Sequence, residues 1–169
     1  MRTTCRAFHL VDIENLLALT HGQPVGLGAG AFYGSVAGVQ PEDLVTVGAD
    51  QSRVFDIRSA FPAARVCSGR GADGADLALI NSIDLDHIAR RFDTIVIGSG
   101  DHRFLDVVYR ARQRSLKVVV VSRRSSLSRA LASYADIVID VPLVDVSLGD
   151  VSSVHVSSGD VSGDLTIAA

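Results

Sequence analysis

The sequence predicts an α/β fold in which helices cover both faces of a mostly parallel sheet, giving a three-layer α/β/α architecture. Short apolar runs alternate with helical segments along most of the chain, and the connections between them are short. Strands and helices that alternate in this way form right-handed βαβ units, and these build parallel sheets. A length of 169 residues, with 47% hydrophobic and 21% charged residues, suits one globular domain. We expect that domain to span residues 1–143.

The first half of the chain predicts three strands. RAFHLVD, residues 6–12, is a short apolar run that ends in a carboxylate, and a helical region around IENLLAL follows it. The stretch HGQPVGLGAG is rich in glycine and proline and predicts a loop. The next predicted elements are, in order, a helix over AFYGSVAGV, a strand over 44–49, a helix over 50–61 and a strand over 64–69.

The second half opens with a long predicted helix over residues 73–92, with Asp73 as its N-cap. DTIVIGSG is the clearest buried strand, because apolar and β-branched residues run together and stop at glycines. A helix from Asp101 to Arg114 and a strand over 116–122 follow. Ser125 or Ser126 is expected to cap a further helix, and DIVIDV predicts the last strand.

Residues 144–169 differ from the rest of the chain and predict an acidic tail rich in Ser, Gly and Val. All 16 Lys and Arg lie at or before Arg129. The tail contains no Lys or Arg but has four aspartates, namely Asp145, Asp150, Asp160 and Asp164. The formal net charge of −3 gives no bulk attraction to polyanions. Any contact with nucleic acid must therefore come from a local basic surface.

The sequence also bears on location. No apolar run approaches the roughly 18 residues that a membrane span needs, and carboxylates occur too early in the chain for a signal peptide. We therefore expect a cytoplasmic protein that makes no membrane contact.

Acidic residues stand where the predicted strands end. Asp12 closes the first strand and Asp101 follows DTIVIGSG, so both should lie at the carboxyl rim of the sheet, where α/β proteins bind ligands. Asp76 lies one turn inside the helix that follows Asp73. Oxygen ligands of this kind suit Mg²⁺, but turn chemistry and the helix dipole also favour acids at such positions. The residue types alone leave both interpretations open.

Several ordered motifs together resemble the NYN domain, a branch of the PIN-like nuclease superfamily, over about residues 6–141. The motifs are VDIEN, GADGADLAL, VIGSGDHRFLDVV and LKVVVVSRRSSLSRALASYADIVIDV. The family's pattern is matched by Asp12, Asn15, Asp76, Ser99, Gly100 and Asp101. The resemblance implies a PIN-like, Rossmannoid fold and a ribonuclease that uses Mg²⁺ or Mn²⁺. Asp12, Asp76 and Asp101 would hold the metal, and Asn15 would orient the first carboxylate or a water.

Two positions depart from the family's pattern. Arg103 stands where family members typically carry a second aspartate, and Ser82 stands where many relatives carry another acid. Asp84 lies about 12 Å along a helix axis from Asp76, too far to share its metal. The site could then bind one ion weakly, recruit Asp73 or Glu14, or retain RNA binding without catalysis.

Basic and polar residues near the same rim are candidates for RNA contact. Arg103 and His102 flank Asp101, and an arginine offers a two-pronged donor to phosphate. Arg123 and Arg124 follow the strand over 116–122, and Ser99 precedes the acidic loop. Plain solvent exposure of the basic side chains is the alternative. RNA is the expected partner, and homo-oligomer formation is left open.

Two other functional classes compete with a ribonuclease. One is the catalytically degenerate RNA-binding or regulatory module that Arg103 favours. The other is a nucleotide-cofactor protein of Rossmann type, since VGLGAGA contains G-x-G-x-x-A. That motif should follow its strand directly, yet Gly26 lies far beyond Asp12 and just after Pro24, which argues against a dinucleotide site.

Overall fold

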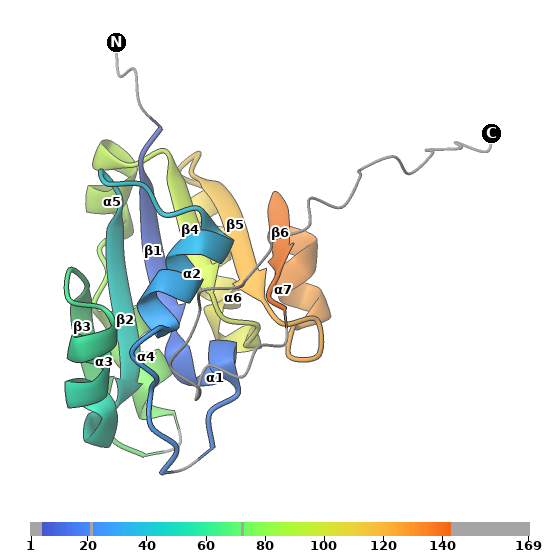
Figure 1. The fold of residues 1–169 in the computed structure, drawn as a ribbon. Helices are drawn as coiled ribbons and strands as arrows, with labels where there is room; N and C mark the ends of the chain where they lie inside the picture. The colour runs from blue at the N-terminus through green and yellow to red at the C-terminus, as the bar shows by residue number, and fades with distance from the viewer. Residues whose placement is uncertain (1–4, 21, 72, 143–169) are drawn as a thin grey trace.

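The computed structural model describes residues 5–20, 22–71 and 73–142. Its centre is a six-stranded sheet in the order β3-β2-β1-β4-β5-β6, in which every neighbouring pair is parallel (Figure 1). The strands are β1 (Ala7–Asp12), β2 (Leu44–Asp50), β3 (Arg65–Gly69), β4 (Thr94–Gly98), β5 (Lys117–Ser122) and β6 (Ile137–Asp140). The predicted parallel sheet is thus confirmed, and the predicted tail over residues 144–169 lies outside the described residues.

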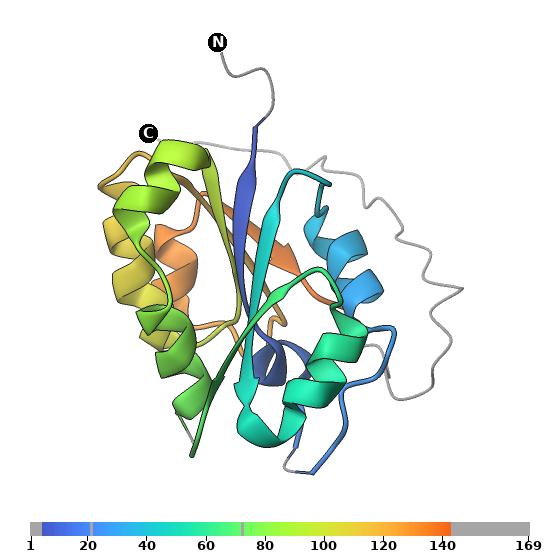
Figure 2. The same cartoon turned by 90° about the vertical axis from the view of Figure 1, so that its left-hand side faces the viewer.

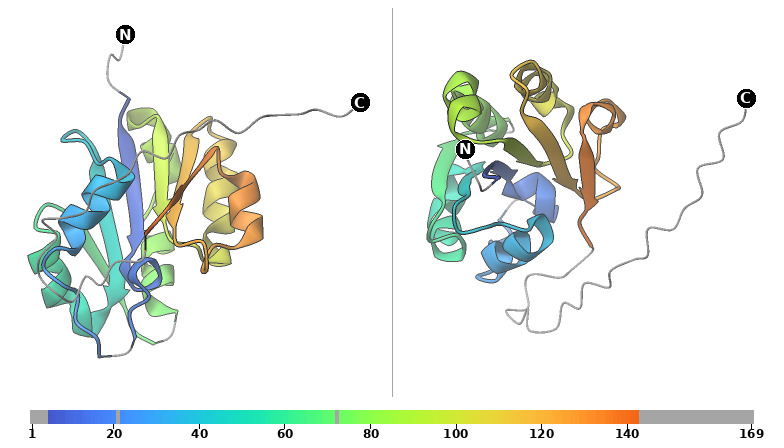
Figure 3. Two further views of the ribbon diagram at one scale, coloured as in Figure 1. Left: turned by 45° about the vertical axis from the view of Figure 1, so that its right-hand side comes forward. Right: turned by 90° about the horizontal axis from the view of Figure 1, so that it is seen from above.

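Helices cover both faces of the sheet, which confirms the three-layer α/β/α architecture (Figures 2 and 3). One face carries α1 (Ile13–Leu17), α2 (Ala29–Ala37) and α3 (Val54–Ala60). The other carries α4 (Gly74–Asn81), α5 (Leu85–Arg91), α6 (Leu105–Arg112) and α7 (Arg129–Tyr134). Short 3-10 helices, η1 (Gln51–Arg53) and η2 (His102–Phe104), precede α3 and α6.

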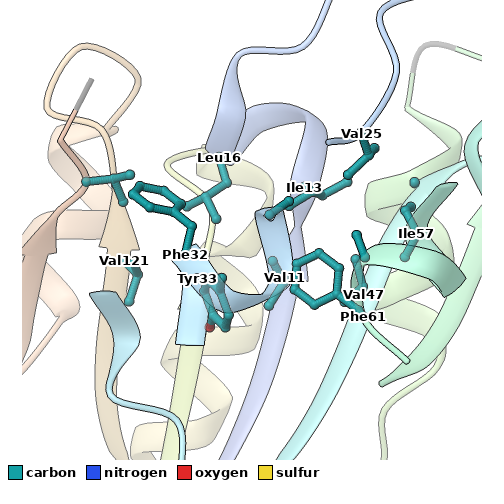
Figure 4. Packing of buried hydrophobic residues seen from close by; sticks show 14 of the residues in the cluster. Val11, Ile13, Leu16, Val25, Phe32, Tyr33, Val47, Ile57, Phe61 and Val121 are labelled. Atoms are coloured by element: carbon teal, nitrogen blue, oxygen red, sulfur yellow. The ribbon is translucent and has the colours of Figure 1, made fainter. Parts of the chain in front are cut away.

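The hydrophobic core is divided by the sheet into two clusters. Successive strand residues point to opposite faces, so Val11 packs with α1 and α2 while Leu10 packs with the helices of the other face. Figure 4 shows the first cluster, in which Tyr33 of α2 lies beside Val11 and Phe32 lies beside Leu16 of α1. Burial on both faces explains why the central strands β1, β4 and β5 consist of continuous apolar runs.

The predicted long helix over residues 73–92 is wrong, because the chain forms two helices there. α4 ends at Asn81, and the Asp84 carboxylate starts α5 by accepting hydrogen bonds from the backbone N–H groups of Asp86 and His87. A capping aspartate inside a helical pattern competes with continuation of the helix, and this explains the break.

One predicted cap is confirmed in position only, and another is wrong. Asp73 occupies the N-cap position of α4, but its side chain makes no capping hydrogen bond and pairs with an arginine instead. The cap of α7 is Ser128, whose hydroxyl accepts from the backbone N–H of Leu131, so the prediction of Ser125 or Ser126 is wrong. A cap at Ser125 would start the helix at residue 126, whereas α7 begins at Arg129.

Gly34 provides a test of helix stability that is independent of any site. It lies inside α2, and a Cβ atom added there meets no atom within 4 Å. Because glycine costs a helix interior about 0.5 to 1 kcal/mol relative to alanine, Gly34→Ala should raise the free energy of unfolding by about that amount. Urea denaturation followed by circular dichroism measures it, and a loss of stability would contradict the described packing of α2.

The strand order places a topological switch point between β1 and β4. The chain runs outward from β1 through β2 to β3 on one side, and from β4 through β5 to β6 on the other. Ligands of open α/β sheets bind where the order reverses, beyond the carboxyl ends of the strands. Asp12 and Asp101 both lie at this point, whereas the motif around Gly26 follows α1 and does not follow a strand directly.

Candidate active site at the switch point of the sheet

Hydrogen bonds tie α1, which directly follows β1, to the loop that follows β4. The backbone N–H of Gly100 donates to Asn15 Oδ1 at 2.9 Å, which bridges the two segments. The buried Ser99 hydroxyl donates to Asp12 Oδ2 at 3.2 Å and accepts from the backbone N–H of Asp101, also at 3.2 Å. Asp12, Asn15, Ser99 and Asp101, four residues that the sequence motifs single out, therefore belong to one connected network.

Residue 100 must be glycine because the loop between β5 and α7 approaches it closely. A Cβ atom there would overlap the backbone carbonyl of Ser126 and the hydroxyl of Ser122. The Gly100 carbonyl in turn accepts from the backbone N–H of Ser128 at 2.9 Å. Glycine is needed here because backbone from the β5–α7 loop packs directly against it.

The Asp12 and Asp76 carboxylates form a buried pair. Their residues are 4% and 8% exposed, and the two side chains lie within hydrogen-bonding reach of each other. Burial, reinforced by the negative charge of Asp76, raises the pKa of Asp12 from its ordinary 3.8 to about 7. Burial also raises the pKa of Asp76. Two carboxylates so placed titrate as a coupled pair.

The close approach of α4 to the sheet brings Asp76 to Asp12. Gly48 of β2 lies beside Asp12 in the strand register, and a Cβ atom on it would collide with the Leu79 side chain of α4. Leu79 lies one turn after Asp76 and is fully buried. Gly48 is therefore a positioning residue that sequence reasoning missed, although a glycine inside a strand is a known signal of close approach.

Capping accounts for part of the acidic cluster but not for the buried pair. Asp12 caps α1 by accepting from the backbone N–H of Asn15 at 3.2 Å, and Asp101 caps η2 by accepting from the backbone N–H of Arg103 at 2.9 Å. Asp101 also lies 3.1 Å from Nδ1 of the exposed His102. Capping does not require Asp12 to be buried against a second carboxylate, and such costly burial is typical of functional sites.

The Arg103 side chain lies among three carboxylates of the cluster. Its Nη2 is 2.8 Å from Asp73 Oδ1, and its Nη1 is 3.1 Å from Asp101 Oδ2 and 3.5 Å from Asp76 Oδ2. The residue that departs from the family's pattern therefore occupies the acidic centre instead of pointing into solvent. Asp73 belongs to the same cluster through this arginine.

The other candidates occupy different positions. Arg123 donates to the backbone carbonyls of Leu16 and Asn15 at 3.1 and 3.0 Å, so it supports the end of α1 that carries Asn15. Arg124 has a side chain that is 92% exposed and lies 4.0 Å from Asp140. Glu14 pairs with the buried Arg53 at 3.2 Å, away from the acidic cluster. Sequence reasoning treated Arg123 and Arg124 as one pair of RNA contacts, but the two side chains lie against different parts of the fold.

The donor set of the site fits one hard divalent ion. Among the described residues, no group of three or more His, Cys, Asp and Glu side chains is arranged to hold a metal ion. Mg²⁺, however, is usually bound by one or two protein carboxylates together with waters and substrate phosphates. The buried Asp12–Asp76 pair provides two carboxylates whose repulsion a cation would relieve.

Among residues 5–20, 22–71 and 73–142, no helix has the length and apolar character for crossing a membrane.

Comparisons with known proteins agree with this architecture. The NYN domain family model matches residues 10–147. A solved structure of a protein of unknown function from Vibrio parahaemolyticus superposes with a TM-score of 0.63 at 20% identity, covering 84% of this chain and 96% of that chain. A solved structure from Bacillus subtilis matches with a TM-score of 0.36 at 14% identity, covering 80% of this chain and 34% of that chain. A TM-score this low does not show a shared fold. No curated protein sequence matches significantly.

Proposed function

This chain belongs to the NYN domain family, and from that membership and the geometry of its acidic centre we propose that it is a metal-dependent ribonuclease. Asp12 and Asp76 would hold Mg²⁺ or Mn²⁺ at the carboxyl rim of the sheet. The observation that carries the proposal is the buried pair itself, since two adjacent carboxylates cost stability unless a cation or proton joins them. PIN-like nucleases, which the family resembles, hydrolyse phosphodiester bonds.

The reaction would be attack of water on an RNA phosphodiester bond. A bound divalent ion supplies a water of lowered pKa and neutralises charge on the phosphate. The residues of this chain provide the positions: Ser99 and the Asn15 backbone fix the Asp12 carboxylate, and Gly48 lets α4 present Asp76. Asp101 pairs with Arg103, which also contacts Asp76, and with the exposed His102. Asn15 links α1 to the loop after β4 and so fixes the position of Asp101.

RNA would approach over the same rim. The Arg103 guanidinium offers donors for phosphate oxygens at the acidic centre, and the exposed His102 and Arg124 side chains, beside Asp101 and Asp140, offer further donors. Arg123 would act on the substrate indirectly, through α1. A cytoplasmic location suits an RNA substrate and forms part of the same proposal.

Arg103 favours a second candidate function, an RNA-binding module without catalysis. Its guanidinium already neutralises part of the acidic cluster, a role that metal ions would otherwise play. Such a module would retain RNA with or without divalent ions and would release uncut RNA.

A cleavage assay with Asp76→Asn separates the two functions. The full-length protein is incubated with labelled single-stranded and hairpin RNA in Mn²⁺, Mg²⁺ or EDTA. Cleavage should require the metal and fall by about 100-fold or more in Asp76→Asn, because loss of even a supporting residue of a metal site costs about 10- to 100-fold. Asp106→Asn, on the exposed face of α6, removes the same charge and should cleave normally. Retention of uncut RNA by wild type and both variants would instead support the binding module.

A further inference from the structure

Arg103 joins two parts of the chain that the sheet brings to one edge. Asp73 and Asp76 come from the start of α4, whereas Asp101 follows β4. One guanidinium nitrogen contacts Asp73, and the other contacts both Asp76 and Asp101. The side chain is 37% exposed, so it reaches the cluster from the solvent side.

The acidic centre therefore has two halves that differ in how their charge is balanced. In one half, Arg103 forms ion pairs with Asp73 and Asp101. In the other, Asp12 faces Asp76, and no ion pair of the described residues reaches the Asp12 carboxylate. Asp76 belongs to both halves, because it contacts Arg103 and also lies next to Asp12.

We infer that the Arg103 guanidinium takes the place of a second divalent cation, so that the acidic centre binds a single ion, at the Asp12–Asp76 half. Nucleases of the two-metal type hold their ions about 3.5 to 4 Å apart between shared carboxylates. A guanidinium is always protonated and competes for the same carboxylate oxygens. It also forms paired hydrogen bonds with phosphate, and this lets it assist the substrate as a second ion would.

This inference rests on the proposed function, since it assigns the number of ions to the same site, but it is tested without RNA. Mn²⁺ binding to the full-length protein is measured by electron paramagnetic resonance of the free ion, for wild type and for Arg103→Ala, Arg103→Asp and Arg103→Lys. Arg110→Ala is the matched control, because the Arg110 guanidinium pairs with the exposed Asp106 on α6, outside the acidic centre. Melting curves with and without Mn²⁺ confirm that each variant folds.

Wild type, Arg103→Lys and Arg110→Ala should each bind one Mn²⁺. Arg103→Ala should bind the first ion about tenfold more tightly, because a nearby positive charge is gone. Arg103→Asp should bind two ions and show a larger rise in melting temperature with Mn²⁺ than wild type. Two ions bound by wild type, or identical Mn²⁺ binding by wild type and both Arg103→Ala and Arg103→Asp, would overturn the inference and leave the nuclease proposal standing. Absence of Mn²⁺ binding by every variant would overturn both.

Discussion

Asp12→Asn is expected to make the protein more stable at pH 8 and to reduce the proposed RNA cleavage. Burial and the nearby Asp76 raise the pKa of Asp12 to about 7, so the ionised form is disfavoured in the folded state. A shift from 3.8 to about 7 corresponds to a penalty of about 2 to 4 kcal/mol, the lower end allowing for charge shared across the pair. Asparagine removes that charge and remains a good N-cap for α1.

The size of the effect depends on pH. Between pH 4 and 7 the folded protein holds a proton on the pair that the unfolded chain has released, so wild-type stability falls as pH rises through that range. The penalty is fully present above pH 7 and is absent below about pH 4. The stability gain of Asp12→Asn should therefore be largest at pH 8 and should shrink on acidification, in metal-free buffer.

Asp84→Asn is the matched control for this prediction. Asp84 also caps a helix with its carboxylate, but it is exposed, and its charge lies near the Arg114 guanidinium. Its replacement should leave the melting temperature at pH 8 nearly unchanged and leave cleavage intact. Cleavage by Asp12→Asn should fall by about 100-fold or more, as for other losses at a metal site. Equal or lower stability of Asp12→Asn at pH 8 would contradict the described burial of the pair.

Gly100→Ala is expected to reduce both stability and cleavage. The added methyl group would overlap the Ser126 carbonyl and the Ser122 hydroxyl, so the loop after β4 or the loop after β5 must move. Overpacking of this kind costs about 1 to 3 kcal/mol, and we expect the upper end because backbone is involved. The same movement breaks the hydrogen bond from Gly100 to Asn15 and displaces Asp101.

Urea denaturation and initial cleavage rates measure the two effects, with Gly34→Ala as the control for the same chemical change. Gly34 has open space around its Cα, so that variant should gain stability and cleave as wild type does. A Gly100→Ala protein that is as stable and as active as wild type would show that the two loops are not packed as described.

The sequence was sufficient to predict the layers of the fold and the gathering of Asp12, Asp76 and Asp101 at one rim. Strand ends are readable because apolar runs stop at polar residues, and parallel strands bring those ends together. It also predicted the family to which the chain belongs.

The finer features depended on a local cap that sequence reasoning missed, at Asp84, and on tertiary contacts that no local pattern encodes. Helix propensity over residues 73–92 was overridden by the cap at Asp84. Asp73 has the residue type and position of a cap, yet Arg103 lies close enough to pair with it. The sequence marked Arg103 as a departure from the family's pattern but could not show that its guanidinium enters the acidic centre. The role of Gly48 appears only when α4 is placed on the sheet.

The central claim is that Asp12 and Asp76 share either a proton or a divalent ion. The measurement that tests it most directly is a pH titration of the Asp12 carboxyl ¹³C resonance, recorded with and without Mg²⁺. Without Mg²⁺ the pKa of Asp12 should be about 7, and saturating Mg²⁺ should lower it below the ordinary 3.8, because a bound cation competes with the proton. An Asp12 that titrates near 3.8 without Mg²⁺, or whose pKa does not change when Mg²⁺ is added, would contradict the claim.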